Sequence, residues 1–358
     1  IGIRRSRKRM KEVFVLKKWG IAVLGCGGIA DFHFRALREV EAARLVGVFS
    51  RSEEKARKAA ETYGCEWTTR AEDLLGRADV DLVDIVTSSG SHYELAKLAL
   101  EHGKHVVVEK PVTMRPEEAQ TLIDLAESRG LTLSVISQRR VEAQHVAVRN
   151  VLDSGALGKL LLVEVSLPFY RAQSYYDSAE WRGTIAQDGG ALMNQGIHSI
   201  DLLLWFGGLV DTVYGKTATQ THRMEAEDIG LALLTFKNGA FGTIMASTSI
   251  QPGFAAALNL YGEKGTIKLE GSAIAHWTVP GIEPPDLGGN TNYGGVSDPR
   301  SISHVNHRVQ MENVIASIEN GDELYLKGID GLRAVQLVEA IYDSSAKGVP
   351  VKLEEVSE

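Results

Sequence analysis

The stretch GIAVLGCGGIA, residues 20–30, decides the fold of the N-terminal part of this chain. An apolar run of strand length leads into a glycine-rich loop, and a helical pattern begins directly after it. Small residues at the first, third and sixth places of the loop let the backbone turn tightly and approach a pyrophosphate, and the helix N-terminus adds N–H donors. The stretch predicts dinucleotide binding, with a tight turn that holds no ligand as the alternative. The predicted contacts are Gly25, Gly27, Gly28, Ile29 and Ala30.

Strand-like and helical patterns alternate around this stretch as far as residue 138. The strand-like runs are Gly20–Leu24, Arg44–Phe49, Leu82–Thr87, His105–Glu109 and Leu131–Ser137. The helical patterns between them cover Ala30–Val40, Glu53–Tyr63, Tyr93–Glu101 and Pro116–Arg129. Strands that alternate with helices predict a parallel, doubly wound sheet, so residues 19–138 are expected to form a Rossmann domain of the α/β class.

The pattern changes after residue 138. A helix is expected over Val141–Leu152, and strands over Leu160–Leu167, Ile229–Phe236, Ala240–Ser247, Ala255–Tyr261 and Thr266–Glu270. A long loop over residues 277–303 and two late helices, His307–Glu319 and Ile329–Lys347, complete the chain. Residues 139–358 therefore predict an α+β domain with a large, mainly antiparallel open sheet for substrate binding and oligomerisation. Its last helices could pack back on the first domain.

Glu109-Lys110-Pro111 follows the buried-strand pattern of residues 105–108. Ligands of such folds bind beyond the carboxyl ends of the strands, so an ammonium at this point could polarise a substrate oxygen beside the cofactor. We assign Glu109 and Lys110 to the cofactor site, and Lys110 also to catalysis. Thr87, at the end of the preceding strand, and His92, before the next helix, are assigned to the cofactor site too.

The end of the second strand bears on which nicotinamide cofactor is used. An acidic residue there would bind the ribose 2′-hydroxyl, whereas an arginine accommodates a 2′-phosphate. The chain has Ser50 and Arg51 at this place, with no acid before Glu53. These residues favour NADP(H) over NAD(H), and the alternative is that Arg51 is a solvated side chain and either cofactor binds.

The segment GGALMNQGIHSID, residues 189–201, places Asn194 and His198 four residues apart, on one face of a helical turn. A neutral imidazole can take a proton from an alcohol that is being oxidised, and Asn194 could hold its tautomer or bind a substrate hydroxyl. The alternative is a core histidine. The neighbouring glycines and polar groups favour function, so both residues are predicted to be catalytic and to contact the substrate.

Together these features resemble the Gfo/Idh/MocA family, the relatives of glucose–fructose oxidoreductase and inositol dehydrogenase. The resemblance rests on the glycine loop, residues 108–111, residues 189–198, EAED at 225–228, YGEKGT at 261–266 and His307. It implies a pyridine-nucleotide oxidoreductase acting on sugars, sugar derivatives or cyclic polyols, with the lysine beside nicotinamide and substrate and the histidine as acid/base. It also implies a cis Lys110-Pro111 bond and a homodimer or homotetramer. Many members have aspartate where this chain has Asn194, which argues against a strict inositol dehydrogenase.

Two rival functions are compatible with the same residues. An NAD-dependent glycosidase would oxidise a ring carbon transiently, eliminate the aglycone, add water and return the hydride. A non-catalytic sensor of nucleotide or sugar would keep the fold without turnover. The presence of both Lys110 and His198 argues against the sensor.

An aromatic and arginine-rich stretch precedes the histidine segment. Aromatic rings suit stacking on a sugar face, and guanidinium groups suit an acidic substituent. The alternative for each residue is an ordinary surface or core role. The predicted substrate contacts, in addition to Asn194 and His198, are Arg171, Tyr176, Trp181, Arg182 and the late His307.

Charge and composition set the remaining expectations. The chain has 358 residues and a net charge of −7, yet its first 18 residues hold eight of the 39 basic and one of the 46 acidic side chains. Residues 1–18 are therefore expected to be a disordered basic leader, and the acidic remainder argues against nucleic-acid partners. No apolar run approaches membrane-spanning length. Two cysteines suit a reducing cytoplasm, and the scattered histidines predict no metal site.

Overall fold

The computed structural model describes residues 17–287 and 303–356, so most of the predicted basic leader lies outside the described residues. Its N-terminal part is a six-stranded parallel sheet with the strand order β3-β2-β1-β4-β5-β6. This is the order of a dinucleotide-binding Rossmann sheet, which confirms the predicted fold. The strands are β1 (Trp19–Leu24), β2 (Ala43–Phe49), β3 (Glu66–Thr68), β4 (Leu82–Ile85), β5 (His105–Val108) and β6 (Leu133–Val135).

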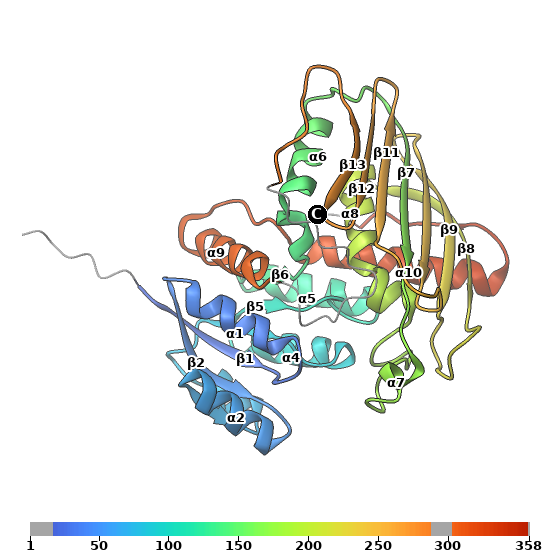
Figure 1. Cartoon of the computed structure of the whole chain (residues 1–358). Coiled ribbons are helices and arrows are strands. Elements are labelled where there is room, and N and C mark those ends of the chain that lie inside the picture. The colour runs from blue at the N-terminus through green and yellow to red at the C-terminus, as the bar shows by residue number, and fades with distance from the viewer. Residues whose placement is uncertain (1–16, 288–302, 357–358) are drawn as a thin grey trace, which may run out of the picture.

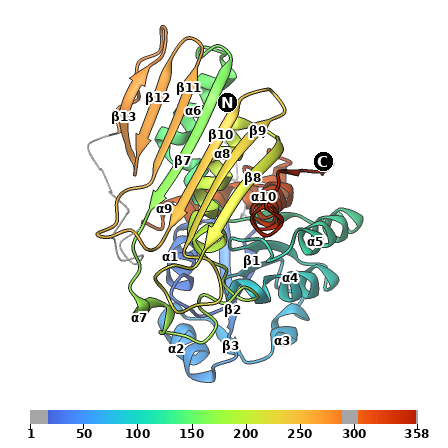
Figure 2. The same cartoon turned by 90° about the vertical axis from the view of Figure 1, so that its right-hand side faces the viewer.

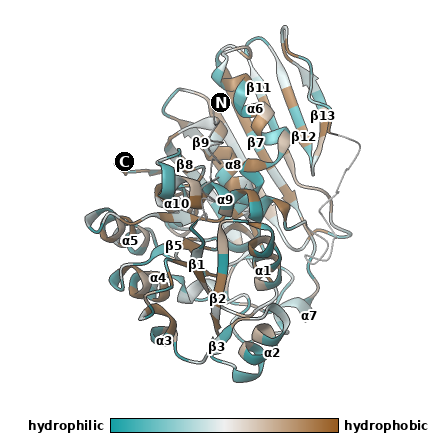
Figure 3. Ribbon diagram, turned by 90° about the vertical axis from the view of Figure 1, so that its left-hand side faces the viewer, coloured by the Kyte–Doolittle hydropathy of each residue, from teal (hydrophilic) through white to brown (hydrophobic). Residues whose placement is uncertain are grey.

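Helices cover both faces of this sheet (Figure 1). They are α1 (Ala30–Glu39), α2 (Glu53–Tyr63), α3 (Ala71–Leu75), α4 (His92–Glu101) and α5 (Pro116–Ser128), with a short turn, η1 (Ser89–Ser91). Figure 3 shows hydrophilic and hydrophobic colours on the same helices, as expected where one helix face is buried. The sequence did not predict β3 and α3, because three and five residues are too few to show a period.

The C-terminal part contains an eight-stranded sheet with the order β13-β12-β11-β7-β10-β9-β8-β14. Only β7 and β10 pair in parallel, which confirms the predicted mainly antiparallel sheet. The strands are β7 (Leu160–Pro168), β8 (Val210–Ala218), β9 (Ile229–Phe236), β10 (Phe241–Ser247), β11 (Ala257–Gly262), β12 (Thr266–Glu270), β13 (Ala273–Thr278) and β14 (Val351–Lys352). The predicted loop begins too early, since β13 includes residues 277 and 278, and residues 288–302 of that loop lie outside the described residues.

Helices of the C-terminal part connect the two sheets. They are η2 (Gln138–Val141), α6 (Ala143–Asp153), α7 (Gln173–Tyr176), the π-helical turn η3 (Ala191–Gly196), α8 (Ile197–Gly207), α9 (Val305–Asn320) and α10 (Gly328–Lys347). Helix α9 packs on α1, and α10 contacts both α5 and β8, so the last two helices join the Rossmann part to the second sheet (Figure 1).

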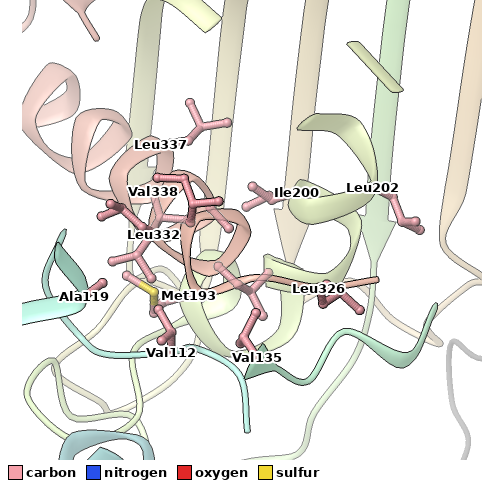
Figure 4. Packing of buried hydrophobic residues seen from close by; sticks show 14 of the residues in the cluster. Val112, Ala119, Val135, Met193, Ile200, Leu202, Leu326, Leu332, Leu337 and Val338 are labelled. Atoms are coloured by element: carbon pink, nitrogen blue, oxygen red, sulfur yellow. The ribbon is translucent and has the colours of Figure 1, made fainter. Parts of the chain in front are cut away.

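One hydrophobic cluster lies directly behind the segments that carry Lys110 and Asn194. Val112 follows the Lys110-Pro111 bond and Met193 precedes Asn194, and both are fully buried. Figure 4 shows them in one cluster with Leu332 of α10. A Cβ atom at Gly331 would lie 3.0 Å from the Cβ of Val112, so α10 packs closely against this strand end. The cluster therefore fixes two backbone segments that are distant in the sequence.

One face of the eight-stranded sheet is not covered by any helix of the described residues (Figure 2). Alternate side chains of β9 show the asymmetry, since Leu234 is 3% exposed whereas Leu233 is 61% exposed. Tyr214 is paired with Leu233 across β8 and β9, and Phe241 lies on β10; both are exposed. Among the described helices, none has the length and apolar character needed to cross a membrane.

Candidate active site

The glycine loop connects β1 to α1 in a way that leaves its outer side open. Gly25 has a φ of 125°, and a Cβ atom there would lie 2.6 Å from the carbonyl oxygen of Val86, so only glycine fits. A Cβ atom at Gly27 or Gly28 would meet nothing within 4 Å. Helix α1 begins at Ala30, directly after this open loop, and the Ala30 N–H donates to the Gly27 carbonyl oxygen at 3.2 Å. The open glycine loop, which ends at Ile29 just before the helix, fits the pyrophosphate of a dinucleotide.

The end of β2 presents an unpaired guanidinium. Ser50 Oγ accepts a hydrogen bond from the Ser52 N–H at 3.2 Å, and Ser52 Oγ caps α2 by accepting from the Lys55 N–H. Arg51 is exposed and has no hydrogen bond or ion pair to any described residue. No carboxylate stands at the end of the strand itself. The arrangement can therefore meet an added phosphate without displacing an existing partner.

Thr87 and His92 lie where β4 ends and α4 begins. Thr87 Oγ1 accepts a hydrogen bond from Ser91 Oγ at 2.8 Å. The buried ring of His92 lies with Nδ1 2.8 Å from the Pro111 carbonyl oxygen and Nε2 3.3 Å from the Thr87 carbonyl oxygen. Burial lowers the pKa of His92, and the single N–H of the neutral ring can donate to one of these two carbonyl oxygens at a time. His92 thus supports the Lys110-Pro111 segment from below, and this bond is cis, as predicted.

Glu109 belongs to a buried chain of ionisable groups beneath the site. His33 of α1 lies with Nδ1 2.8 Å from Asp84 Oδ2 and Nε2 3.0 Å from Glu109 Oε1. Burial alone would lower the pKa of His33, but the two carboxylates outweigh it and raise the pKa to about 10. The other oxygen of Glu109 accepts a hydrogen bond from the Lys110 N–H at 3.0 Å. The chain therefore holds the backbone that carries Lys110.

His307 of α9 completes this buried group without bonding to it. Its Nε2 lies 3.7 Å from Glu109 Oε1, and both ring nitrogens are buried without a hydrogen-bond partner among the described residues. Ligand atoms of His33, Glu109 and His307 lie within 4.8 Å of one another, the only such grouping in the part of the chain that is described. Despite burial, the two carboxylates raise the pKa of His33 to about 10, and a protonated imidazole has no lone pair for a metal. We therefore interpret the group as an ion cluster, and His307 as lying beneath the substrate site.

Lys110 and Asn194 meet above this cluster. Lys110 Nζ donates to the Asn194 backbone oxygen at 3.0 Å and to its Oδ1 at 3.3 Å. Asn194 Nδ2 in turn donates to Asp188 Oδ1 at 2.6 Å. Burial lowers the pKa of Lys110, while the negative charges of Glu109 and Asp188 oppose that shift. The lysine is thus held by oxygen atoms at a strand end, beside the glycine loop.

His198 stands on the first turn of α8, half-buried, and its Nδ1 has no hydrogen-bond partner among the described residues. Burial, together with the positive charge of Lys110, lowers the pKa of His198 to about 3. The imidazole is therefore neutral at physiological pH and has a lone pair that can accept a proton. Its position near Lys110 is consistent with the two residues acting on one substrate hydroxyl.

The π-helical turn η3 sets the spacing between Asn194 and His198. Its first N–H groups are satisfied by Glu227, because Leu192 N–H donates to Oε1 at 2.7 Å and Ala191 N–H to the backbone oxygen at 2.8 Å. A Cβ atom at Gly190 would lie 2.1 Å from that backbone oxygen, so a glycine is required. π-Helical turns occur frequently at functional sites. Here the turn widens the backbone just before the histidine.

Two arginines gather around one tyrosine at the edge of the site. Arg182 Nη1 donates to Tyr175 Oη at 2.7 Å, and Arg171 Nη2 donates to Gln195 Oε1 at 3.0 Å. The guanidinium carbons lie 4.3 and 5.8 Å from the centre of the Tyr175 ring. Arg182 also lies over the Trp181 ring at 4.6 Å, and its Nε is buried without a hydrogen-bond partner. Neither arginine is paired with a described carboxylate, so the pair can receive an anion.

Tyr176, predicted to contact substrate, is placed elsewhere. It is 5% exposed, and its hydroxyl donates to Thr248 Oγ1 at 2.8 Å inside the second domain. Tyr175 faces the arginines instead. The two are adjacent on the short helix α7, so neighbouring side chains point in different directions.

Sequence reasoning missed His33, Asp188, Tyr175 and Glu227 at this site. His33 contacts Glu109, 76 residues away, and Glu227 contacts Leu192, 35 residues away. Asp188 contacts Asn194, and Tyr175 contacts Arg182, across 6 and 7 residues. Three of them had a local signal: Asp188 adjoins the glycine pair at 189–190, Tyr175 lies in the aromatic and arginine-rich stretch, and Glu227 lies in EAED at 225–228. His33 is revealed only by the fold.

Family models match both parts of the chain. The model described as "Oxidoreductase family, NAD-binding Rossmann fold" covers residues 19–137, and the "GFO/IDH/MocA C-terminal domain" covers residues 145–268. The chain belongs to the Gfo/Idh/MocA family. It is an NAD(P)-dependent oxidoreductase that acts on CH–OH groups of a sugar, a sugar derivative or a cyclic polyol.

Several members of the Gfo/Idh/MocA family are similar along most of the chain. The dTDP-3,4-didehydro-2,6-dideoxy-alpha-D-glucose 3-reductase of Streptomyces violaceoruber is 31% identical, over 74% of this chain and 78% of its own. The NADP(+) scyllo-inositol 2-dehydrogenase of Bacillus subtilis is 27% identical over 99% of both. The WlbA dehydrogenase of Bordetella pertussis, solved with NADH and UDP-GlcNAcA, is 32% identical with a TM-score of 0.86, covering 95% of this chain and 100% of its own.

Proposed function

We propose that this oxidoreductase acts on a nucleotide-linked sugar that carries a carboxylate. The observation that carries the proposal is the position of Arg171 and Arg182 around Tyr175, at the edge of the Lys110 site. Neither guanidinium forms an ion pair with a described carboxylate. The buried Nε of Arg182 has no hydrogen-bond acceptor among the described residues, and a carboxylate or phosphate of a ligand would supply one. The similarity to the WlbA dehydrogenase solved with UDP-GlcNAcA supports the same class of substrate.

In the proposed reaction His198 is the general base for the sugar hydroxyl. Its lowered pKa keeps the imidazole neutral, so the lone pair is available for the hydroxyl proton; the same shift makes the ring a weak base, so the hydroxyl must be polarised by Lys110. Lys110 donates a hydrogen bond to the same oxygen as negative charge develops on it, and thereby stabilises the product carbonyl as well. The bound dinucleotide supplies the acceptor for the hydride. Ketone reduction would use the same side chains in the opposite direction.

Asn194 is proposed to orient both the lysine and the substrate. It presents two oxygen atoms to Lys110 Nζ, and this holds the ammonium at the strand end before substrate binds. Holding a reacting group in its productive position can contribute several kcal/mol to a barrier reduction, roughly 7–11 in favourable cases. Trp181, under the Arg182 guanidinium, offers an aromatic surface for the sugar.

NADP(H) is the proposed cofactor, with NAD(H) as the alternative. The support is the absence of an acid at the end of β2 and the exposed guanidinium of Arg51. Glycine loop residues 25–30 would hold the pyrophosphate in either case. The relatives include an NADP(+) enzyme and structures with NADH, so both cofactors occur among similar proteins.

A homodimer is proposed through the uncovered face of the second sheet. The exposed apolar side chains there include Leu231, Leu233 and Phe241, at 48%, 61% and 62% exposure. Large apolar side chains gathered on an open sheet are typical of an interface with another chain. A symmetric dimer would bury the same patch on both copies.

The test is turnover with a sugar panel. Purified protein with NADP+ or NAD+ is mixed with UDP-sugars that differ only in a 6-carboxylate, with free sugars and with inositols, and reduced nicotinamide is followed by absorbance. Faster turnover of the carboxylated UDP-sugar is expected. Arg182→Gln should raise KM for that substrate about ten- to a hundredfold, because a charge-assisted bond is lost. The control Arg70→Gln changes a side chain that is 73% exposed on the Rossmann part.

Two outcomes would contradict the proposal. Equal turnover with and without the carboxylate, unaffected by Arg182→Gln, would remove the acidic-sugar assignment. Release of an aglycone without net reduction of nicotinamide would replace the dehydrogenase by an oxidation–elimination glycosidase.

A further inference from the structure

Asp188 is a buried carboxylate that reaches the lysine site through Asn194. It is 2% exposed and lies in the loop between Gly183 and the π-helical turn η3. Its Oδ1 accepts a hydrogen bond from Asn194 Nδ2 at 2.6 Å. Its Oδ2 accepts one from the Gly183 N–H at 2.8 Å. Both carboxylate oxygens therefore accept hydrogen bonds. One binds Asn194, which contacts Lys110, and the other binds the loop that carries Arg182.

The bond from Asn194 to Asp188 determines which end of the amide faces the lysine. An amide has a donor end and an acceptor end, and a carboxylate accepts only from the donor end. With Nδ2 directed at Asp188, Oδ1 is left facing Lys110 Nζ at 3.3 Å. The reversed amide would place its NH2 against the ammonium and its oxygen against the carboxylate. Asp188 thus excludes the orientation in which Asn194 would repel the lysine.

We propose that Asp188 is a positioning residue that acts through Asn194 on Lys110 and couples the arginine-bearing loop to the reacting centre. This inference rests on the proposed function of Lys110. The carboxylate holds the amide in one orientation, supplies negative charge near the ammonium, and anchors the N–H next to Arg182. No group of the substrate has to touch Asp188 for these effects.

Electrostatics support the same role. The groups that act on Lys110 are Glu109 and Asp188, which favour its charged form, and Arg182, which disfavours it. Burial is the largest effect and lowers the pKa of Lys110. Neutralising Asp188 removes one of the two opposing carboxylates, so the pKa of Lys110 should fall further. A side chain with a merely structural role would leave that pKa unchanged.

The experiment uses Asp188→Asn and the double variant Asp188→Asn with Asn194→Asp. The double variant exchanges the carboxylate and the amide within the hydrogen-bonded pair, so the charge returns next to Lys110. The exposed Asp124→Asn on α5 is the matched control. Reactivity of Lys110 toward acetic anhydride is measured across pH by mass spectrometry of its peptide, and kcat and KM are measured on the substrate found by the panel.

Asp188→Asn is expected to shift the labelling midpoint of Lys110 to lower pH and to lower kcat about ten- to a hundredfold, because the ammonium is no longer held in place. The double variant should restore the midpoint and part of kcat. An unchanged midpoint and pH profile in Asp188→Asn would overturn the proposal. Because labelling needs no substrate, a shifted midpoint in an enzyme that turns over none of the sugars would contradict the proposed function while leaving the role of Asp188 intact.

Discussion

Lys110 Nζ contacts both oxygens of Asn194, the backbone oxygen at 3.0 Å and Oδ1 at 3.3 Å, although 84 residues separate the two in the chain. The lysine follows strand β5 of the Rossmann sheet, and the asparagine lies in the π-helical turn η3 of the C-terminal part. Their contact therefore forms only when the two parts pack together. The candidate active site is a property of that packing.

Removing the ammonium should lower turnover far more than cofactor affinity, although Lys110 is assigned to both the cofactor site and catalysis. Lys110→Met is expected to lower kcat about a hundred- to a thousandfold, since one donor to the developing oxyanion is lost. Dinucleotide affinity, measured by nicotinamide fluorescence, should change little, because the glycine loop is untouched. Lys58→Met on the exposed side of α2 is the control. Loss of dinucleotide binding in Lys110→Met would show that the lysine serves the cofactor instead.

The pH profile of kcat/KM should lack an acid limb near pH 6.5. The pKa of His198 is lowered to about 3, so the base stays deprotonated as pH falls through the ordinary histidine range. As pH rises, activity should begin to fall before pH 10.5, the ordinary pKa of a lysine. Burial lowers the pKa of Lys110, and only the charged form of Lys110 stabilises the substrate oxygen. Initial rates over this range test both limbs. A limb at pH 6.5 that disappears in His198→Asn would show that His198 is the base but titrates like an ordinary histidine, which would contradict its lowered pKa.

Arg51 should decide the preference between the two dinucleotides. Arg51→Ala is expected to raise KM for NADP+ about ten- to a hundredfold, as a charge-assisted hydrogen bond to the 2′-phosphate is lost, and to leave KM for NAD+ unchanged. The ratio of kcat/KM values for the two cofactors measures the effect. Equal changes for both cofactors would indicate that Arg51 supports the fold of the loop.

The buried pair around His33 should make stability depend on alkaline pH. Its pKa rises from 6.5 to about 10 on folding, so its stabilisation is complete below pH 6.5 and is lost as pH rises through about 10. His33→Ala leaves Asp84 and Glu109 unpaired and should cost about 3–5 kcal/mol at pH 6.5. Urea unfolding measures both effects, with the exposed His276→Ala as control. An identical loss at pH 6.5 and 10 would refute the charged form of His33.

A charge on the uncovered sheet face should separate the proposed dimer. Leu233→Asp places a carboxylate at a position that is 61% exposed in the single chain, so the monomer fold should tolerate it while a buried interface would not. Light scattering coupled to size exclusion is expected to give a dimer for the parent protein and a monomer for the variant. Glu61→Lys on exposed α2 is the control. A monomeric parent protein would refute the interface.

Much of the fold could be predicted because its signals are local. The glycine loop between β1 and α1 and the alternation of apolar runs identify the parallel sheet, and apolar alternation identifies β9 to β12. Strand β8 was not predicted, and neither were β3 and β13. Exposed or mixed side chains on both faces of β3 and β13 remove the period on which such predictions depend.

The candidate site divides in the same way. Lys110, Asn194 and His198 were predicted as chemically suitable residues next to glycines and strand ends, and the structure brings them together. Tyr176 and Tyr175 show the limit, because nothing local tells which of two adjacent tyrosines turns into the core. His33 was beyond reach, since 76 residues separate it from Glu109, and the EAED motif gave no sign that Glu227 accepts from the N–H of Leu192, 35 residues away.

By itself the sequence determined the element types, the glycine loop and the reactive residue types, because these follow from backbone sterics, side-chain period and functional groups within a few residues. Only the tertiary structure decided the protonation states and the orientation of the site. Packing buries Lys110 and His198 and thereby lowers the pKa of each, and it places Asp188 where it orients the Asn194 amide. Burial and through-space charge depend on distances between atoms, and the order of residues in a chain does not specify those distances.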